Sequence, residues 1–264
     1  MPLADKSAAW PVLEVRGLCK AHTQGRWWQR QFQVRALDNI DLTLNVGSTL
    51  ALVGESGAGK STLAMCLVGL LEPDAGEIVF DGRRLGELRG EERATLCRKI
   101  QLIFQDSAGA LNPRMSAAEI VEEPLVIAGE ESRLRRQRAL RAMEQVGLPS
   151  AWSNRRPHEL SGGQRQRLAI ARALLLEPKL VILDEVLAGL DLSIQGQISN
   201  LLLDLQSEHN LSYLCISHDL AHVGQFADEV AVIHQGKITG GNRAPQAIDQ
   251  PRERVFSARA GARG

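Results

Sequence analysis

The sequence lacks net charge, long apolar runs and a secretory signal. Its 31 basic and 31 acidic side chains balance, so no overall field draws the protein to nucleic acid. No apolar run approaches the roughly 20 residues that a membrane-spanning helix needs, and the first six residues contain no apolar segment of the secretory kind. We expect a soluble protein without bound nucleic acid that does not cross a membrane, although it can lie against one.

Paired cysteines are also absent. Cys19, Cys66, Cys97 and Cys215 are scattered without a C-x-x-C pair, which predicts reduced intracellular thiols packed as small apolar groups rather than a metal cluster. Apolar residues, by contrast, make up 44% of the 264 positions, against 23% charged. This composition suits one large domain, or one domain with an inserted subdomain.

The chain is organised around a glycine-rich stretch that follows the apolar run Thr49–Val53 and precedes a second apolar run, 63–68. This order predicts a strand, a tight loop and a helix around the pattern G-x-x-x-x-G-K-S. Glycines let successive backbone N–H groups point at phosphate oxygens, and the helix N-terminus adds partial positive charge. We therefore predict a nucleotide-binding loop rather than an ordinary glycine turn.

Two side chains of this loop have specific expected roles. Lys60 is expected to reach the outer phosphates of the nucleotide, and the Ser61 hydroxyl to bind Mg²⁺. The predicted nucleotide-binding residues of the loop are Gly54, Glu55, Ser56, Gly57, Ala58, Gly59, Lys60, Ser61 and Thr62.

Strands are expected on both sides of the loop. Residues 12–18 and 36–44 alternate apolar and polar side chains around a turn-prone segment, 23–30, which predicts a small antiparallel layer on the adenine side of the site. Asp81 and Gly82 indicate a hairpin, and a further strand is predicted over residues 98–104, ending at Gln105.

A helical region follows. Ser116 and Glu119 form a capping-box pattern, and the region is expected to run, with a break at Pro124, to about Gly147. Its basic run, 133–141, predicts the solvated face of an amphipathic helix, with a membrane headgroup contact as the alternative.

A second candidate anion site opens another helix. Ser161, Gly162, Gly163 and Gln164 precede the helical run 168–175, and N–H groups at a helix N-terminus attract anions. A well-capped surface helix is the alternative. We favour the functional interpretation because a phosphate loop in the same chain needs a partner.

Carboxylates are expected beside the phosphate loop. Residues 180–183 are continuously apolar and lead into Asp184 and Glu185, as in a parallel strand that is covered on both faces and carries ligand-binding groups at its carboxyl end. Asp184 would hold Mg²⁺ through water, and Glu185 would polarise an attacking water. A further buried strand, 211–217, leads into His218, which we also expect to be functional.

Together these stretches resemble the ATP-binding cassette of ABC transporters over nearly the whole chain. Residues 54–61 match the Walker A loop, 160–164 the signature motif and 180–185 Walker B. The single-residue matches are Gln105 to the Q-loop, Asp191 to the D-loop and His218 to the switch histidine. The resemblance implies an α/β fold with a RecA-like P-loop NTPase core, an antiparallel β layer and an inserted helical subdomain. It also implies that two cassettes sandwich ATP, each phosphate loop facing the other's signature motif.

The resemblance assigns roles and boundaries. It implies catalysis by Glu185, His218 and Gln105, and Mg²⁺ binding by Ser61, Gln105 and Asp184. The nucleotide-binding residues it adds to the loop are His22, Ser161, Gly162, Gly163, Gln164 and Asp191. The whole chain, 1–264, would be one ABC ATPase domain. Its expected parts are the β layer and core over about 12–104 and 168–240, the helical subdomain with the signature motif over 105–167, and a short tail over 241–264.

Finer resemblance points to one branch of importers. Residues 104–115 and 189–198, and the polar insertion before Ala36, are similar to cassettes that serve peptide and nickel importers. This implies two membrane permeases, a sister ATPase subunit in a homo- or heterodimer, and an extracytoplasmic solute-binding protein as partners. It also implies a peripheral position on the cytoplasmic face of the inner membrane.

Three departures from the family pattern stand out. His22 replaces the aromatic residue that stacks on adenine, and Val186 with Ala188-Gly189 replaces the usual Pro and Ser-Ala, which would alter the D-loop. The tail from Arg243 lacks a His-Pro-Tyr-Thr stretch common among peptide-importing members. This absence tilts the expectation toward nickel or a metal chelate, with a dipeptide or oligopeptide importer as the alternative.

Three other classes are disfavoured. A soluble ABC ATPase acting on ribosomes or DNA usually has two cassettes or a long coiled coil, and this chain has neither, nor a basic bias. An exporter cassette fits the Q-loop region poorly. A non-hydrolysing subunit is disfavoured because Lys60, Asp184, Glu185 and His218 are all present.

Overall fold

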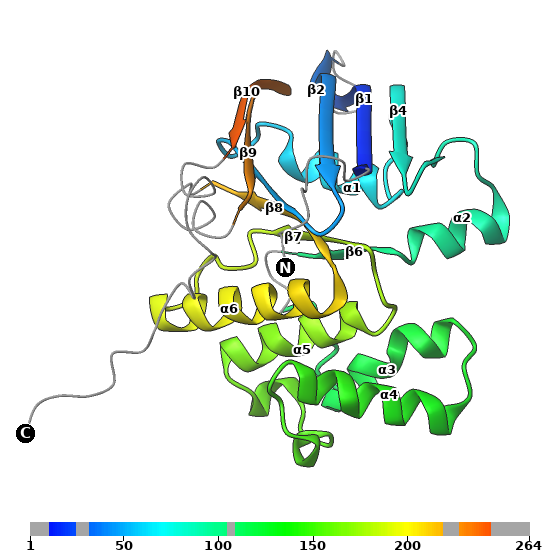
Figure 1. The fold of residues 1–264 in the computed structure, drawn as a ribbon, viewed down its shortest axis with the longest axis vertical. Helices are drawn as coiled ribbons and strands as arrows, with labels where there is room; N and C mark the ends of the chain where they lie inside the picture. Colours follow the sequence, from blue (N-terminus) through cyan, green and yellow to red (C-terminus); the bar gives the residue numbers. More distant parts are fainter. Residues whose placement is uncertain (1–10, 25–31, 105–108, 219–226, 244–264) are drawn as a thin grey trace, which may run out of the picture.

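The computed structural model describes residues 11–24, 32–104, 109–218 and 227–243. In these ranges the chain forms two β-sheets and a layer of helices (Figure 1). The antiparallel sheet lies at the top of the view, the six-stranded sheet runs from the upper left into the middle, and α3, α4 and α5 lie below it. The expected α/β architecture is confirmed.

The six-stranded sheet has the order β10-β9-β3-β8-β7-β6. Its strands are β3 (Thr49–Val53), β6 (Ile100–Ile103), β7 (Leu180–Asp184), β8 (Ser212–Ser217), β9 (Glu229–His234) and β10 (Lys237–Arg243). All neighbours are parallel except β9 and β10. Every residue of β7 is buried, as its continuous apolar run predicts. Val181 and Leu183 pack against the helices, whereas Leu180 and Ile182 pack toward the antiparallel sheet.

The antiparallel sheet has the order β2-β1-β4-β5. Its strands are β1 (Pro11–Gln24), β2 (Phe32–Asn45), β4 (Ala75–Phe80) and β5 (Arg83–Arg84). Strand β1 continues two residues into the segment predicted as a turn. The predicted hairpin at Asp81 and Gly82 joins β4 to β5, and both residues have positive φ, 51° and 74°, as a tight two-residue hairpin turn requires.

The helices are α1 (Lys60–Leu67), α2 (Gly90–Cys97), α3 (Ala117–Ile127), α4 (Ser132–Gln145), α5 (Gly162–Leu174) and α6 (Leu192–His209), with short 3₁₀ turns at Ser150–Trp152 and Pro157–Glu159. The capping box that opens α3 is confirmed, because the Ser116 side chain accepts from the Glu119 N–H and the Glu119 carboxylate accepts from the Ser116 N–H. In the part of the chain that the structure describes, none of these helices combines the length and apolar character needed to span a membrane.

Two local expectations are wrong, and one helix was not predicted. Pro124 does not break its helix but lies inside α3, where the burial of Val121 and Leu125 outweighs the hydrogen bond that proline removes. Helix α2 was not expected. The strand predicted from residue 98 begins only at Ile100, because Arg98 and Lys99 finish the last turn after α2.

The basic run lies on α4, which is amphipathic as predicted, with Ala139, Ala142 and Met143 buried. Arg133 and Arg141 are exposed, whereas Arg135 and Arg138 are only partly exposed. Arg135 donates to the Glu130 carbonyl at 2.5 Å, and Arg138 to the Glu130 carboxylate at 2.5 Å. These bonds tie α4 to the turn that precedes it, which weakens the case for a membrane headgroup contact.

Candidate nucleotide-binding site

The glycine-rich loop joins β3 to α1, as predicted, and its backbone passes close to the antiparallel sheet. Gly57 and Gly59 have φ of 81° and 108°, values that side chains with a Cβ rarely adopt. A Cβ on Gly59 would lie 2.3 Å from the Ala36 carbonyl oxygen of β2. Only glycine therefore fits at position 59, so the close approach of the two elements depends on it.

Lys60 is held inside this loop. Its side chain is buried, and its ammonium group donates to the carbonyl oxygens of Gly54 at 2.6 Å and Glu55 at 2.8 Å. Because Lys60 is also the first residue of α1, its positive charge adds to the positive end of the helix dipole. The loop thus presents concentrated positive charge of the kind that attracts phosphate.

The Ser61 hydroxyl and the Asp184 carboxylate are in contact beside the glycine-rich loop. Ser61 Oγ donates to Asp184 Oδ2 at 3.2 Å, so the predicted approach of β7's carboxyl end to the loop is observed. Burial and, to a smaller extent, the charge of Glu185 raise the pKa of the Asp184 carboxyl, while the hydrogen bond from Ser61 and the charge of Lys60 oppose the shift. Two oxygen donors at this separation suit Mg²⁺, which prefers carboxylate, hydroxyl and water oxygens. The donor set therefore fits the predicted metal.

Glu185 and His218 form a contact at the same edge of the sheet. His218 Nδ1 lies 3.1 Å from Glu185 Oε1, and the glutamate side chain is 17% exposed against 59% for the histidine. Glu185 has a φ of 50°, in the left-handed region, and its N–H donates to the Ile216 carbonyl at 2.9 Å. A left-handed non-glycine residue is uncommon and often marks a functional site. Here it turns the chain sharply after Asp184.

The loop, Asp184 and Glu185 line one pocket of about 480 Å³. His22 closes one side, with Nε2 3.3 Å from Thr62 Oγ1. The sequence did not indicate five further lining residues, which come from β2 and from the β9–β10 turn: Val34, Arg35, Ala36, Gln235 and Gly236. The dipeptide Gln235-Gly236 between two alternating runs does indicate a turn, but its position against the loop depends on tertiary packing.

Gly236 secures that turn. Its N–H donates to the Ala58 carbonyl at 3.0 Å, and its carbonyl accepts from the Asp38 N–H at 2.8 Å. With φ of 76° and the Ala36 carbonyl oxygen only 2.8 Å from a hypothetical Cβ, the position requires glycine. It links the phosphate loop to the antiparallel sheet.

The signature residues lie elsewhere. Ser161 caps α5 in a capping box with Gln164, whose N–H donates to Ser161 Oγ at 3.3 Å. Contrary to the expectation of an open anion site, this N–H already has a partner. Asp191 precedes α6, and a Cβ on Gly163 would lie 2.8 Å from Ile194 Cγ2 of that helix. The N-termini of α5 and α6 are therefore in contact. Within the described residues, neither helix start lines the pocket.

Gln105 lies outside the described residues, so its predicted catalytic and metal-binding roles rest on the sequence alone. The same holds for the segment 25–31 and for the tail after Arg243. The structure thus brings together Lys60, Ser61, Asp184 and Glu185 in one pocket, with His218 bonded at its edge.

Known proteins resemble the chain in sequence and in fold. A family model described as "ABC transporter" matches residues 37–188. The dipeptide transport ATP-binding protein DppF of Haemophilus influenzae is 44% identical over 244 residues, which cover 91% of this chain and 74% of that protein. A putative peptide import ATP-binding protein of Brucella ovis is 46% identical over 229 residues, covering 86% and 71%. A solved dimeric post-hydrolysis state of the ATP-binding cassette MJ0796 bound to ADP and Pi matches with a TM-score of 0.76 at 29% identity, covering 88% of this chain and 98% of that one.

Proposed function

Because the chain belongs to the ABC transporter family and is an ATP hydrolase of that family, we propose that it powers an importer of the peptide and nickel branch. The pocket in which Lys60 and Ser61 of the glycine-rich loop meet Asp184, with Glu185 beside them, is the observation that supports ATP hydrolysis as the power source. The relatives named for dipeptide and peptide import support the importer branch. A cation, a hydroxyl and two carboxylates around a phosphate loop are the groups that phosphoryl transfer to water requires.

Each group has a proposed task. The loop N–H groups and Lys60 bind the phosphates of ATP, and Thr62 and His22 bound the nucleotide side of the pocket. Ser61 and Asp184 hold Mg²⁺, which when bound supplies positive charge to the phosphate oxygens. Glu185 orients the attacking water and takes up its proton, and His218 positions the Glu185 carboxylate through the 3.1 Å contact. Gln105 is proposed, from the sequence alone, to assist both tasks.

The site is proposed to be completed by a second cassette. Ser161, Gly162, Gly163, Gln164 and Asp191 are at the N-termini of α5 and α6, outside the chain's own pocket, which supports a role on the nucleotide of another subunit. The MJ0796 cassette is described as dimeric, which supports the same arrangement. We also propose that the chain divides into the β layer with core, the helical subdomain and the tail, with the boundaries given in the sequence analysis. Helix α5 runs across the boundary between residues 167 and 168.

The partners and cargo follow from the branch. Two membrane permeases, a sister ATPase subunit and, indirectly, an extracytoplasmic solute-binding protein are the proposed partners, with the chain bound at the cytoplasmic face of the inner membrane. The relatives named for dipeptide and peptide import support a peptide cargo. A nickel or metal-chelate cargo rests on the tail sequence after Arg243. The experiment below tests both cargoes.

The test is an uptake assay in a strain that lacks the chromosomal copy of the gene. The wild-type chain or its Lys60→Ala variant is supplied on a plasmid, and uptake of radioactive nickel and of a labelled dipeptide is measured separately. Recovery of one uptake by the wild type, and not by the variant, supports importer function and identifies the cargo class. Recovery of neither, with ATP hydrolysis by the purified chain that the Lys60→Ala variant lacks, would contradict the import proposal and leave the hydrolase assignment intact.

A further inference from the structure

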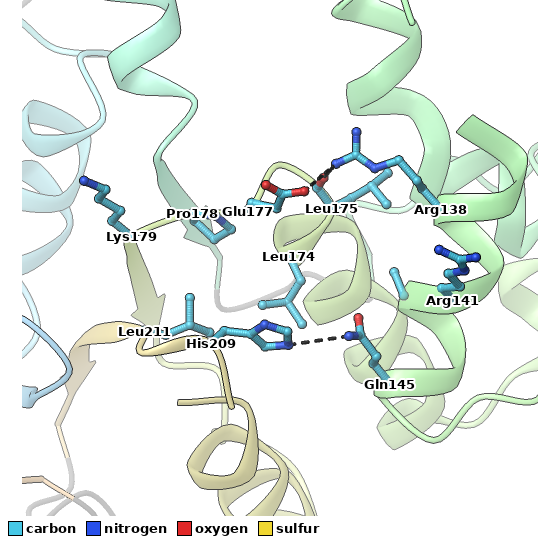
Figure 2. A pocket seen from close by; sticks show the side chains of 11 residues that line it. Arg138, Arg141, Gln145, Leu174, Leu175, Glu177, Pro178, Lys179, His209 and Leu211 are labelled. Atoms are coloured by element: carbon cyan, nitrogen blue, oxygen red, sulfur yellow. Dashed lines mark hydrogen bonds and ion pairs between the residues drawn. The ribbon is translucent and has the colours of Figure 1, made fainter. Parts of the chain in front are cut away.

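A second cavity lies where the helical layer meets the central sheet. It has a volume of about 510 Å³ and is bounded by α4, the C-terminal end of α5, the segment before β7, and the end of α6 (Figure 2). This volume is within the usual range for small-molecule sites, roughly 300 to 1,000 Å³. The cavity is therefore large enough for an organic ligand.

The cavity is separate from the nucleotide pocket. It adjoins the start of β7, since Lys179 lines it, whereas Asp184 at the other end of β7 lines the nucleotide pocket. A strand of this length spans about 13 Å, and the two sites share no lining residue. Both sites can accordingly be occupied at the same time.

Two of the cations at the cavity already have partners. Arg138 donates to the carboxylates of Glu130 at 2.5 Å and Glu177 at 3.1 Å, and also to the Leu175 carbonyl at 2.8 Å. Lys179 bonds Asp81 at 2.6 Å, and in Figure 2 its side chain points away from the cavity. These groups hold the surrounding loops together and are not available to a ligand.

Arg141 differs from these two. It is exposed on α4 one turn before Gln145, and its guanidinium forms no hydrogen bond or ion pair with another residue in the described ranges. Gln145 Nε2 lies 3.5 Å from His209 Nε2 on α6, and Figure 2 shows these two side chains meeting across the cavity. The polar rim of the cavity thus offers a guanidinium and an amide from α4 and an imidazole from α6.

The negative ends of three helices also lie here, because α4, α5 and α6 end at Gln145, Leu174 and His209. Their partial charges oppose anion binding, but carbonyl oxygens at these ends are already hydrogen-bonded. The Leu174 carbonyl accepts from the Glu177 N–H at 2.8 Å, and that of Gln206 accepts from the Asn210 N–H. The Glu177 carboxylate also lines the cavity, but it pairs with Arg138 at 3.1 Å. Among the described residues, Arg141 therefore brings the unpaired full charge to the rim.

The inner wall of the cavity is apolar, formed by Ala142, Leu174 and Leu211. We propose that this cavity binds a small organic anion, with its apolar body on this wall and its anionic group on Arg141, flanked by Gln145 and His209. A charged hydrogen bond to arginine gives the anion its selectivity, and burial of the apolar body gives binding strength.

The test uses anilinonaphthalene sulfonate, a fluorescent aromatic anion, and phenylnaphthylamine, which has the same aromatic body without the sulfonate. The full-length protein is first saturated with a non-hydrolysable ATP analogue, so that the nucleotide pocket is occupied. We expect saturable binding of one sulfonate probe per chain, and weaker binding of the neutral probe. Arg141→Gln should weaken sulfonate binding about tenfold or more, while changing affinity for the neutral probe little.

The matched control is Arg133→Gln, which removes an equal charge from an exposed arginine of the same helix and should leave both affinities unchanged. Arg141 is at the surface and outside the proposed catalytic groups, so unchanged ATP hydrolysis by Arg141→Gln shows that it folds. Equal affinity for both probes, no saturable binding beside the ATP analogue, or an equal loss in the two variants would overturn the proposal. None of these outcomes depends on the importer function.

Discussion

Replacing Glu185 by glutamine separates nucleotide binding from hydrolysis. The substitution keeps the size of the side chain and an oxygen that can accept a hydrogen bond from His218, now 3.1 Å from Glu185 Oε1. It leaves Lys60 and the Ser61–Asp184 contact in place. The backbone of residue 185 is left-handed, and we expect glutamine to bear the same strain cost there as glutamate. We therefore expect the variant to fold and to bind ATP.

The expected loss is in turnover. Removing a positioned carboxylate base costs on the order of 10² to 10⁴ in rate, which corresponds to about 3 to 5 kcal/mol of transition-state free energy. The variant should therefore retain ATP and accumulate as an ATP-bound dimer. Phosphate release measures the loss of turnover, and gel filtration with and without ATP measures the dimer.

Asp184→Asn provides the contrast. Asp184 contacts Ser61 rather than His218, so its replacement should lower affinity for Mg²⁺-ATP as well as the rate. If Glu185→Gln loses ATP binding, or keeps full turnover, Glu185 is not the carboxylate that acts on water. Equal behaviour of the two variants would also refute the division of roles.

Three further outcomes are expected. Lys60→Ala should abolish ATP binding or turnover without unfolding the chain, measured by nucleotide titration beside circular dichroism; a normal hydrolysis rate would refute the loop assignment. The specific ATPase rate of the isolated chain should be low and rise with protein concentration, because half of each site is proposed to come from another copy; a strictly constant specific rate would contradict this. Gly236→Ala should lower the free energy of unfolding by about 1 to 3 kcal/mol in urea titrations, because a Cβ would lie 2.8 Å from the Ala36 carbonyl oxygen at a positive φ. The control Gly240→Ala, with open space around its Cβ, should change it less.

Sequence patterns predicted the features that depend only on residues close together in the sequence. The glycine loop between β3 and α1, the capping box at Ser116, and the buried strand that ends at Asp184 are all present. Helix α2 was missed because it has no buried residue and so carries no apolar periodicity to detect. Pro124 was misjudged because burial of its neighbours, rather than local backbone preference, decides the helix there.

The sequence by itself determined the residue types of the site, because each motif specifies a local conformation through glycine, capping and strand periodicity. Only the tertiary structure placed the β2 residues and Gly236 against the loop, since two sheets must pack before Ala36 and Ala58 can contact the same turn. It also left Ser161 and Asp191 outside the lining of the chain's own pocket. The physical reason is that chain segments far apart in sequence meet through burial of their apolar faces, and that burial is a property of the whole packed core.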